Sequence, residues 1–261
     1  MPRYFIELCY NGNGFHGWQY QPNAITVQEV IETNLSKLLG GPTGVTGAGR
    51  TDTGVHASYY VAHFDTDRTE LENSEPFIYK LNGMLPPGIA ILNIKQVNSE
   101  AHARFDAVLR TYQYRIQRKK DPFRSEFSWL YSAPLNKEVM QKGAEILLNH
   151  NDFRSFSKVH TDVKTFICNI QKAEWSFSET EWIFTISADR FLRNMVRAIV
   201  GTLWELGRGK ISLEDMDLII KSGNRSNAGL SVPASGLTLT DIKYPEHVFV
   251  SLFFNFQKQF S

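Results

Sequence analysis

One glycine-rich stretch, residues 47–57, combines the side-chain types that covalent or acid–base chemistry requires. It reads GAGRTDTGVHA and contains a single carboxylate, Asp52, two residues after a single guanidinium, Arg50. Glycines so closely spaced permit positive φ angles and allow a ligand to approach the backbone. An Asp held on such a loop is a candidate catalytic carboxylate. The alternative is an Asp that only caps the turn, which is its commoner role in Gly-rich loops.

The residues on either side of this stretch predict that it joins two strands. Residues 43–46 (TGVT) and 58–64 (SYYVAHF) are rich in β-branched and aromatic side chains, which suit a pleated surface. We therefore expect residues 47–57, called the Asp loop below, to be held by a sheet at both ends.

A second candidate group is a row of arginines near residue 190. Arg190, Arg193 and Arg197 have the spacing i, i+3, i+7 inside a segment, residues 190–206, whose apolar pattern predicts a helix. This spacing places the three guanidiniums on one face of the helix, roughly opposite its apolar face. No acidic residue lies between them, so the row is expected to face an anion. A solvated basic face is the alternative.

A third group mixes cations with aromatic rings. Residues 104–124 contain seven Lys or Arg against two Asp, interleaved with Tyr112, Tyr114 and Phe123. Rings among cations suit stacked bases and phosphates, whereas a solvated strand edge guarded by lysines is the alternative. The net charge of the chain is only +1, so nucleic-acid binding would have to come from local clusters of this kind.

Several other chemistries fit the sequence poorly. Asp52, Thr53 and Gly54 form the triplet of aspartic proteases, but that reaction needs two such Asp residues sharing a proton, and the chain has one copy. A homodimer would be required, and the neighbouring arginine favours an ionised Asp. The phosphate-binding pattern G-x-x-x-x-G-K-[ST] and metal-ligand spacings are absent, so neither an NTPase nor a zinc enzyme is indicated.

The Asp loop resembles, almost letter for letter, the signature G-x-G-R-T-D-x-G-V-H of the bacterial tRNA pseudouridine synthase A family. Only Thr53 departs from the commonest form, which has Ala there. The segments G-W-Q at 17–19, H-A-R-F at 102–105 and M-V-R-x-I-V-G at 195–201 are similar to the family as well. The resemblance extends, in order, from about residue 4 to about residue 242.

This resemblance implies an α+β enzyme of two domains, residues 1–105, which carry the Asp loop, and residues 106–261. Each domain would be a largely antiparallel sheet with helices packed on one face, and the active-site cleft would lie between them. The implied reaction is the isomerisation of uridine to pseudouridine at positions 38, 39 and 40 of tRNA, in the anticodon stem-loop. The family works as a homodimer and without a cofactor.

The resemblance also implies roles for individual residues. Asp52 would be the nucleophile and Arg197 its ion-pair partner, while three residues would hold the substrate. These are Tyr112 packed on the base, Leu237 lining the pocket and Arg50 holding the flipped nucleotide. Arg190 and Arg193 occupy positions where the family varies, and we expect them to contact phosphates. A catalytically inert RNA-binding protein on the same scaffold is the alternative, and it would not need Asp52.

The remaining features predict a globular protein in a reducing compartment. The only cysteines, Cys9 and Cys168, have no redox spacing, and the N-terminal residues show no signal-peptide pattern, so we expect a cytoplasmic protein. The patterning predicts strands over residues 3–10, 58–65, 89–97, 107–118, 164–178 and 181–188, helices over 75–84, 135–148 and after caps at Thr26 and Ser212, and a tail, 247–254, that closes the sheet.

Overall fold

A single mixed sheet, mostly antiparallel, forms the centre of the computed structural model, which describes residues 1–158 and 163–250. Its main path runs β4-β1-β3-β9-β5-β8-β7, with β2 paired to β3 and β6 paired to β5. The strands are β1 (Arg3–Tyr10), β2 (Thr46–Gly47), β3 (His56–Asp65), β4 (Ile89–Val97), β5 (Leu109–Gln117), β6 (Trp129–Leu130), β7 (Ile170–Phe177), β8 (Glu181–Ala188) and β9 (Leu237–Lys243).

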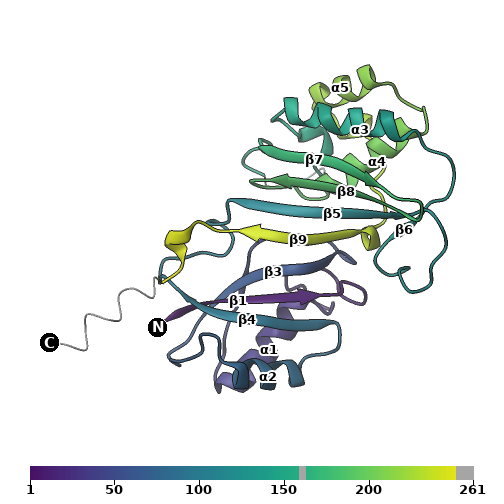
Figure 1. Ribbon diagram of the computed structural model, residues 1–261. Helices are drawn as coiled ribbons and strands as arrows, with labels where there is room; N and C mark the ends of the chain where they lie inside the picture. The colour runs from purple at the N-terminus through teal and green to yellow at the C-terminus, as the bar shows by residue number, and fades with distance from the viewer. Residues whose placement is uncertain (159–162, 251–261) are drawn as a thin grey trace.

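The α-helices of the described residues gather beside the two ends of this sheet. They are α1 (Val27–Leu39), α2 (Glu75–Met84), α3 (Lys137–Ile146), α4 (Met195–Gly207) and α5 (Leu213–Ser222). Figure 1 shows α1 and α2 beside the β4-β1-β3 part and α3, α4 and α5 beside the β8-β7 part. None of the helices in the described ranges combines the length and the apolar character needed to cross a membrane. The chain is therefore an α+β protein with one large sheet.

The buried side chains form two clusters that meet at the middle of the sheet. The first is built mainly from the N-terminal half, but it also includes Leu239, Ile242 and Val248 from the C-terminal end. The second is built mainly from the C-terminal half and includes Val55 from the Asp loop. Each cluster thus takes apolar residues from both halves of the chain.

Along the main path of the sheet, β3 and β9 at its middle share the fewest paired residues. β3 and β9 run parallel and pair only at His56↔Thr238 and Ala57↔Leu239, whereas β1 and β3 pair at seven positions. His56, near the end of the Asp loop, is also the first residue of β3. The predicted nucleophile therefore lies where the two parts of the sheet join.

Most predicted elements are confirmed, and the capping signals locate helix ends well. The Thr26 hydroxyl accepts a hydrogen bond from the Glu29 amide at the start of α1, and Gly40 ends that helix with φ +82°. Ser212 and Asp215 form a reciprocal capping box at the start of α5.

The predicted helix over residues 190–206 is wrong at its start. Asn194 has φ +66° and ψ 2°, a left-handed conformation that a right-handed helix cannot contain, and α4 begins at Met195. Arg190 and Arg193 therefore precede the helix, and the common helical face expected for the three arginines does not exist.

Two further expectations differ from the structure. The strand predicted over 164–178 is β7, and it begins only at Ile170. In the predicted closing tail, residues 246–248 form a 3-10 turn and Phe249 makes one isolated bridge to Val97, while residues 251–254 lie outside the described residues.

Candidate active site

The Asp52 carboxylate lies between two guanidiniums. Oδ1 is 3.6 Å from Nε of Arg193, and Oδ2 is 3.7 Å from Nη1 of Arg197. Both distances exceed the range of a direct charge-assisted hydrogen bond, so the attraction leaves lone pairs of the carboxylate free. The Asp52 side chain is 26% exposed, which keeps it accessible to a reactant. Its closest charged partners are thus arginines, in contrast to the turn-capping alternative.

Buried aromatic side chains pack against the Asp loop and form hydrogen bonds with it. The Tyr60 hydroxyl donates to the Gly49 carbonyl, and the Tyr10 hydroxyl lies 2.9 Å from Oγ1 of Thr51. The Trp18 ring stacks on Tyr60 with a centroid distance of 4.1 Å, and the Trp18 amide donates to the Thr51 carbonyl. All three rings are buried, so the loop backbone rests on a packed wall.

Gly47 is required by this packing. A Cβ at this position would lie 2.3 Å from Oη of Tyr60 and 2.4 Å from Nε1 of Trp18. The close approach of the loop to its aromatic support therefore explains the first glycine of the motif.

Arg197 is anchored more firmly than Arg193. It lies in the first turn of α4, and its Nε donates to the Val232 carbonyl at 2.8 Å, which leaves Nη1 directed towards Asp52. The Arg197 side chain is 21% exposed, compared with 54% for Arg193. The proximity of Arg197 to Asp52 agrees with the expected pairing, and the proximity of Arg193 was not foreseen.

Tyr112 reaches this region through the register of the sheet. It lies opposite Leu239 of β9, which in turn lies opposite Ala57 of β3. Its ring meets Phe191 edge-on at 5.2 Å. Burial, together with the negative charge of Asp52, raises the pKa of the Tyr112 hydroxyl to about 12, although the charge of Arg110 opposes this shift. The hydroxyl therefore stays protonated at neutral pH.

The other predicted site residues, Leu237, Arg50 and Arg190, differ from one another in burial and in the groups around them. Leu237 is the first residue of β9, is 6% exposed and belongs to the second buried cluster. Arg50 is exposed on the Asp loop, with no ion pair or hydrogen bond to any residue of the described ranges. Among the described residues, the ion pairs of Asp52 are with Arg193 and Arg197 and not with Arg190. Its charge acts on Cys168, whose pKa burial raises to about 12 against the opposing effect of Arg190.

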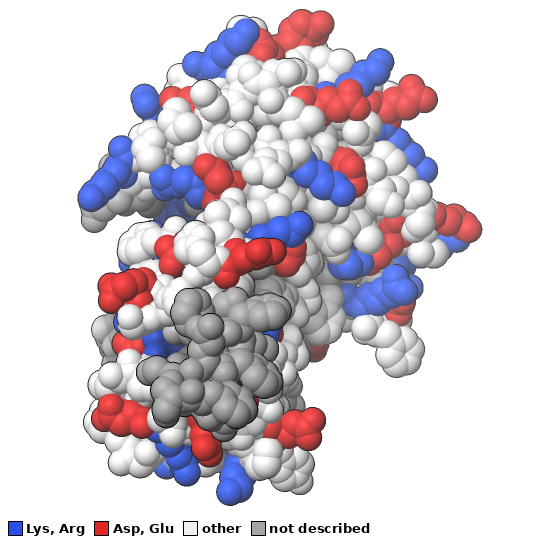
Figure 2. All heavy atoms as spheres, turned by 60° about the vertical axis from the view of Figure 1, so that its left-hand side comes forward, with Lys and Arg blue, Asp and Glu red and all other residues white. Residues whose placement is uncertain are grey.

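The cations of residues 104–124 are largely engaged within the protein. Arg110 and Arg118 donate to backbone carbonyls. Arg115 and Lys119 pair with Glu181 and Glu179, two carboxylates that come from the distant β7–β8 turn. The linear count of charges therefore overstated the basic field of this segment. The face in Figure 2 likewise interleaves Lys and Arg with Asp and Glu.

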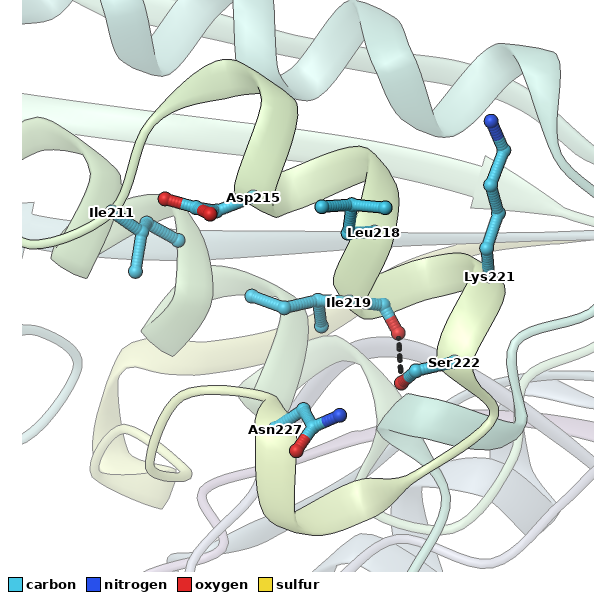
Figure 3. Close-up of a pocket in the computed structure, with 7 residues that line it drawn as sticks. All are labelled: Ile211, Asp215, Leu218, Ile219, Lys221, Ser222 and Asn227. Carbon is cyan, nitrogen blue, oxygen red and sulfur yellow. Dashed lines mark hydrogen bonds between the residues drawn. The ribbon is translucent and has the colours of Figure 1, made fainter.

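The pocket drawn in Figure 3 is a different place in the molecule. It is lined by Leu218 and Lys221 of α5 and by Ile211 just before that helix, among others, and none of the predicted site residues contributes to it. In the described part of the chain, no group of three His, Cys, Asp or Glu side chains is arranged to hold a metal ion.

Comparison with known proteins gives a consistent result. Residues 144–245 match the family model described as tRNA pseudouridine synthase. A protein of Bacteroides fragilis named tRNA pseudouridine synthase A is 50% identical over 95% of this chain and 98% of its own. Proteins of the same name from Porphyromonas gingivalis and Exiguobacterium sibiricum are 47% and 35% identical, over 96% and 94% of this chain and 100% and 98% of their own.

These matches define first a class, the isomerases that make pseudouridine in tRNA. Within that class, the chain belongs to the tRNA pseudouridine synthase A family.

Proposed function

We propose that this chain isomerises uridine to pseudouridine in the anticodon stem-loop of tRNAs, at positions 38, 39 and 40, with Asp52 as the nucleophile. The observation that carries the proposal is the Asp52 carboxylate, partly exposed and set 3.6 and 3.7 Å from two guanidiniums. The relatives named as tRNA pseudouridine synthase A supply the reaction class and the nucleic acid.

The chemistry explains why one carboxylate is enough. The C–N glycosidic bond of uridine breaks, and the sugar carbon C1′ passes through an electron-poor state that a carboxylate can trap, as in retaining glycosidases. Uracil leaves as a delocalised anion, turns within the site and forms a new bond from C5 to C1′. The Asp52–C1′ bond breaks as this bond forms, so the carboxylate is regenerated. C5 then loses its proton to solvent and N1 takes one up, and the net change is an isomerisation. Arg193 and Arg197, 3.6 and 3.7 Å away, would orient the carboxylate towards C1′.

The remaining residues suit the handling of a flipped nucleotide. Extruding a base costs a few kcal/mol, which contacts to the nucleotide and phosphates offset. Arg50 is exposed two residues from Asp52, so it is available to hold the nucleotide. The Tyr112 ring offers a wall for the base, and Leu237 would close the apolar side of the pocket. Arg190 would contact a phosphate farther along the RNA.

The proposal extends to the organisation of the enzyme. We propose two units, residues 1–105 and 106–261, with the active-site cleft between them. The presence of two buried clusters supports this division, although each cluster includes some residues from the other half of the chain. We further propose a homodimer in the cytoplasm that works without a cofactor. Free Cys9 and Cys168 suit a reducing compartment. Sedimentation equilibrium of the purified chain tests the dimer directly, and a monomeric mass would contradict it.

The test of function is tritium release from tRNA transcript labelled at C5 of uridine. Wild-type protein should release label from positions 38, 39 or 40, and Asp52→Asn should lose at least about 10³-fold of the rate because no nucleophile remains. Binding of tRNA by Asp52→Asn should stay within about fivefold of wild type, since the carboxylate adds little to phosphate recognition. Tight binding by wild type with no release of label would favour the inert RNA-binding alternative.

A further inference from the structure

Arg110 makes an unusual set of contacts close to the Asp52 site. From β5 its guanidinium donates to four backbone carbonyls. Nη1 bonds Ala107 at 3.2 Å and Asp189 at 2.7 Å, while Nη2 bonds Ala48 at 2.9 Å and Arg104 at 2.7 Å. Among the ion pairs of the described residues, none includes Arg110. Burial lowers the pKa of this guanidinium, and the four carbonyl dipoles replace the water that it has lost.

The four carbonyls belong to segments that are far apart in the sequence. Ala48 lies in the Asp loop, four residues before Asp52. Asp189 directly follows β8 and begins the segment that carries Arg193 and leads into α4. Arg104 and Ala107 belong to the connection between β4 and β5. The Arg110 side chain therefore links two backbone segments. One, at Ala48, precedes Asp52, and the other, at Asp189, precedes Arg193 and Arg197.

We propose that Arg110 is a positioning residue that sets the separation between Asp52 and its two arginines. The planar fork supplies donors in fixed directions, and each of its two terminal nitrogens meets two carbonyls here. A lysine has one nitrogen and cannot span the same four oxygens. The distances of 3.6 and 3.7 Å at Asp52 therefore depend on a residue that does not touch the carboxylate.

Arg118 provides a matched control. It comes directly after the same strand, and its guanidinium also donates to backbone carbonyls, those of Tyr131, Ser132 and Ala133. Those carbonyls lie in the segment after β6, which carries none of the proposed site residues. Arg118→Lys therefore removes the same kind of interaction without changing the ties between the Asp loop and the arginines.

The first measurement does not depend on enzymatic activity. Amide hydrogen exchange, followed by mass spectrometry on the full-length chain, should be faster in Arg110→Lys over residues 47–55 and over 189–195 together, by about fivefold or more, because both segments lose a fixed anchor. In Arg118→Lys only the segment around 131–133 should change. Unaltered exchange in either of the two Arg110-linked segments would overturn the proposal, whether or not the chain modifies tRNA.

The second measurement rests on the proposed function. With saturating enzyme and C5-labelled tRNA, Arg110→Lys should turn over about 10²-fold more slowly, because misplacement of reacting groups by about 1 Å has this effect on rate. Its tRNA affinity should match wild type, and Arg118→Lys should keep its rate within about threefold.

Three results of this second measurement would contradict positioning by Arg110. Full activity of Arg110→Lys would mean that only the positive charge near Tyr112 matters. An equal loss of rate in Arg118→Lys, measured well below both unfolding temperatures, would indicate general destabilisation. A loss of tRNA affinity that accounts for the loss of rate would make Arg110 a binding residue. If wild type itself releases no label, the proposed function fails and the exchange result stands alone.

Discussion

The Asp loop and the segment that carries its arginine partner are held in opposite ways. The Asp loop rests on buried rings of Tyr10, Trp18 and Tyr60 and is tied to them by hydrogen bonds. The facing segment, residues 189–194, has no regular secondary structure and ends in a left-handed residue, Asn194. The Asp loop carries the Asp52 carboxylate and the facing segment carries the Arg193 guanidinium, and these two groups lie 3.6 Å apart. The comparison indicates that the carboxylate has a fixed place and that its cations differ in how firmly they are held.

The two arginines show this difference directly. Arg197 is on a helix and bonded to the Val232 carbonyl, whereas Arg193 lies before the helix and its side chain is half exposed. Their distances to Asp52 are nearly equal. Equal distance therefore does not imply an equal contribution, because solvent screens the exposed ion pair more strongly.

The largest effect of breaking this arrangement is expected from Arg197→Gln. Loss of the anchored guanidinium should reduce the single-turnover rate by about 10²–10³-fold, the usual effect of removing a preorganised electrostatic contact. Affinity for tRNA and its dependence on salt should change little, because the assigned partner is Asp52. An altered salt slope with an unchanged rate would show that Arg197 binds RNA and that its pairing with Asp52 is not used.

Tyr112→Phe should have the next largest effect. The ring and its contact with Phe191 are kept while the hydroxyl is lost, so a proton-handling role would appear as a rate decrease of about 10²-fold. Since the pKa of this hydroxyl is raised from 10 to about 12, it remains protonated as pH rises from 6 to 9. The wild-type and Phe variant pH–rate profiles should thus have the same shape over that range. If both Tyr112→Phe and Tyr112→Ala match wild type, the residue does not line the site.

A smaller effect is expected from Arg193→Gln, which tests the more exposed of the two guanidiniums. Its exposed ion pair should contribute no more than about tenfold to the rate, because such pairs are strongly screened. If Arg193 also meets a phosphate, the slope of log K against log salt should flatten by up to about one unit. A rate loss as large as that of Arg197→Gln would show that both guanidiniums are held equally firmly in the complex.

Gly47→Ala tests the rigid side, and its effect should fall on stability. A Cβ here would overlap Tyr60 and Trp18, and overpacking of this kind costs about 1–3 kcal/mol of unfolding free energy. Gly49→Ala is the control, because no heavy atom lies within 4 Å of the Cβ that it would add. Denaturant unfolding of both variants measures the difference. Equal stability of the two variants would mean that Tyr60 and Trp18 shift at little cost and that their packing does not fix the Asp loop.

The sequence by itself determined the local elements and the identity of the nucleophile candidate. The helix starts after Thr26 and Ser212 follow from interactions within a few residues, which is why capping signals located them correctly. The Asp loop could be recognised because its glycines, Arg50 and Asp52 are contiguous. Tyr112 and Arg197 were assigned from the family resemblance, and their roles stay predictions, although Arg197 lies 3.7 Å from Asp52.

Only the tertiary structure decided which distant groups meet Asp52. The left-handed Asn194 breaks a helical pattern that periodicity extended to residue 190. Arg193, which precedes this residue, lies 3.6 Å from Asp52, whereas Arg190 makes no ion pair with Asp52. Likewise, Glu179 and Glu181 neutralise cations some sixty residues away, and the Arg110 guanidinium collects carbonyls from three segments. Such contacts depend on long-range strand pairing and chain direction. They cannot be predicted from the spacing of residues within a short stretch of sequence.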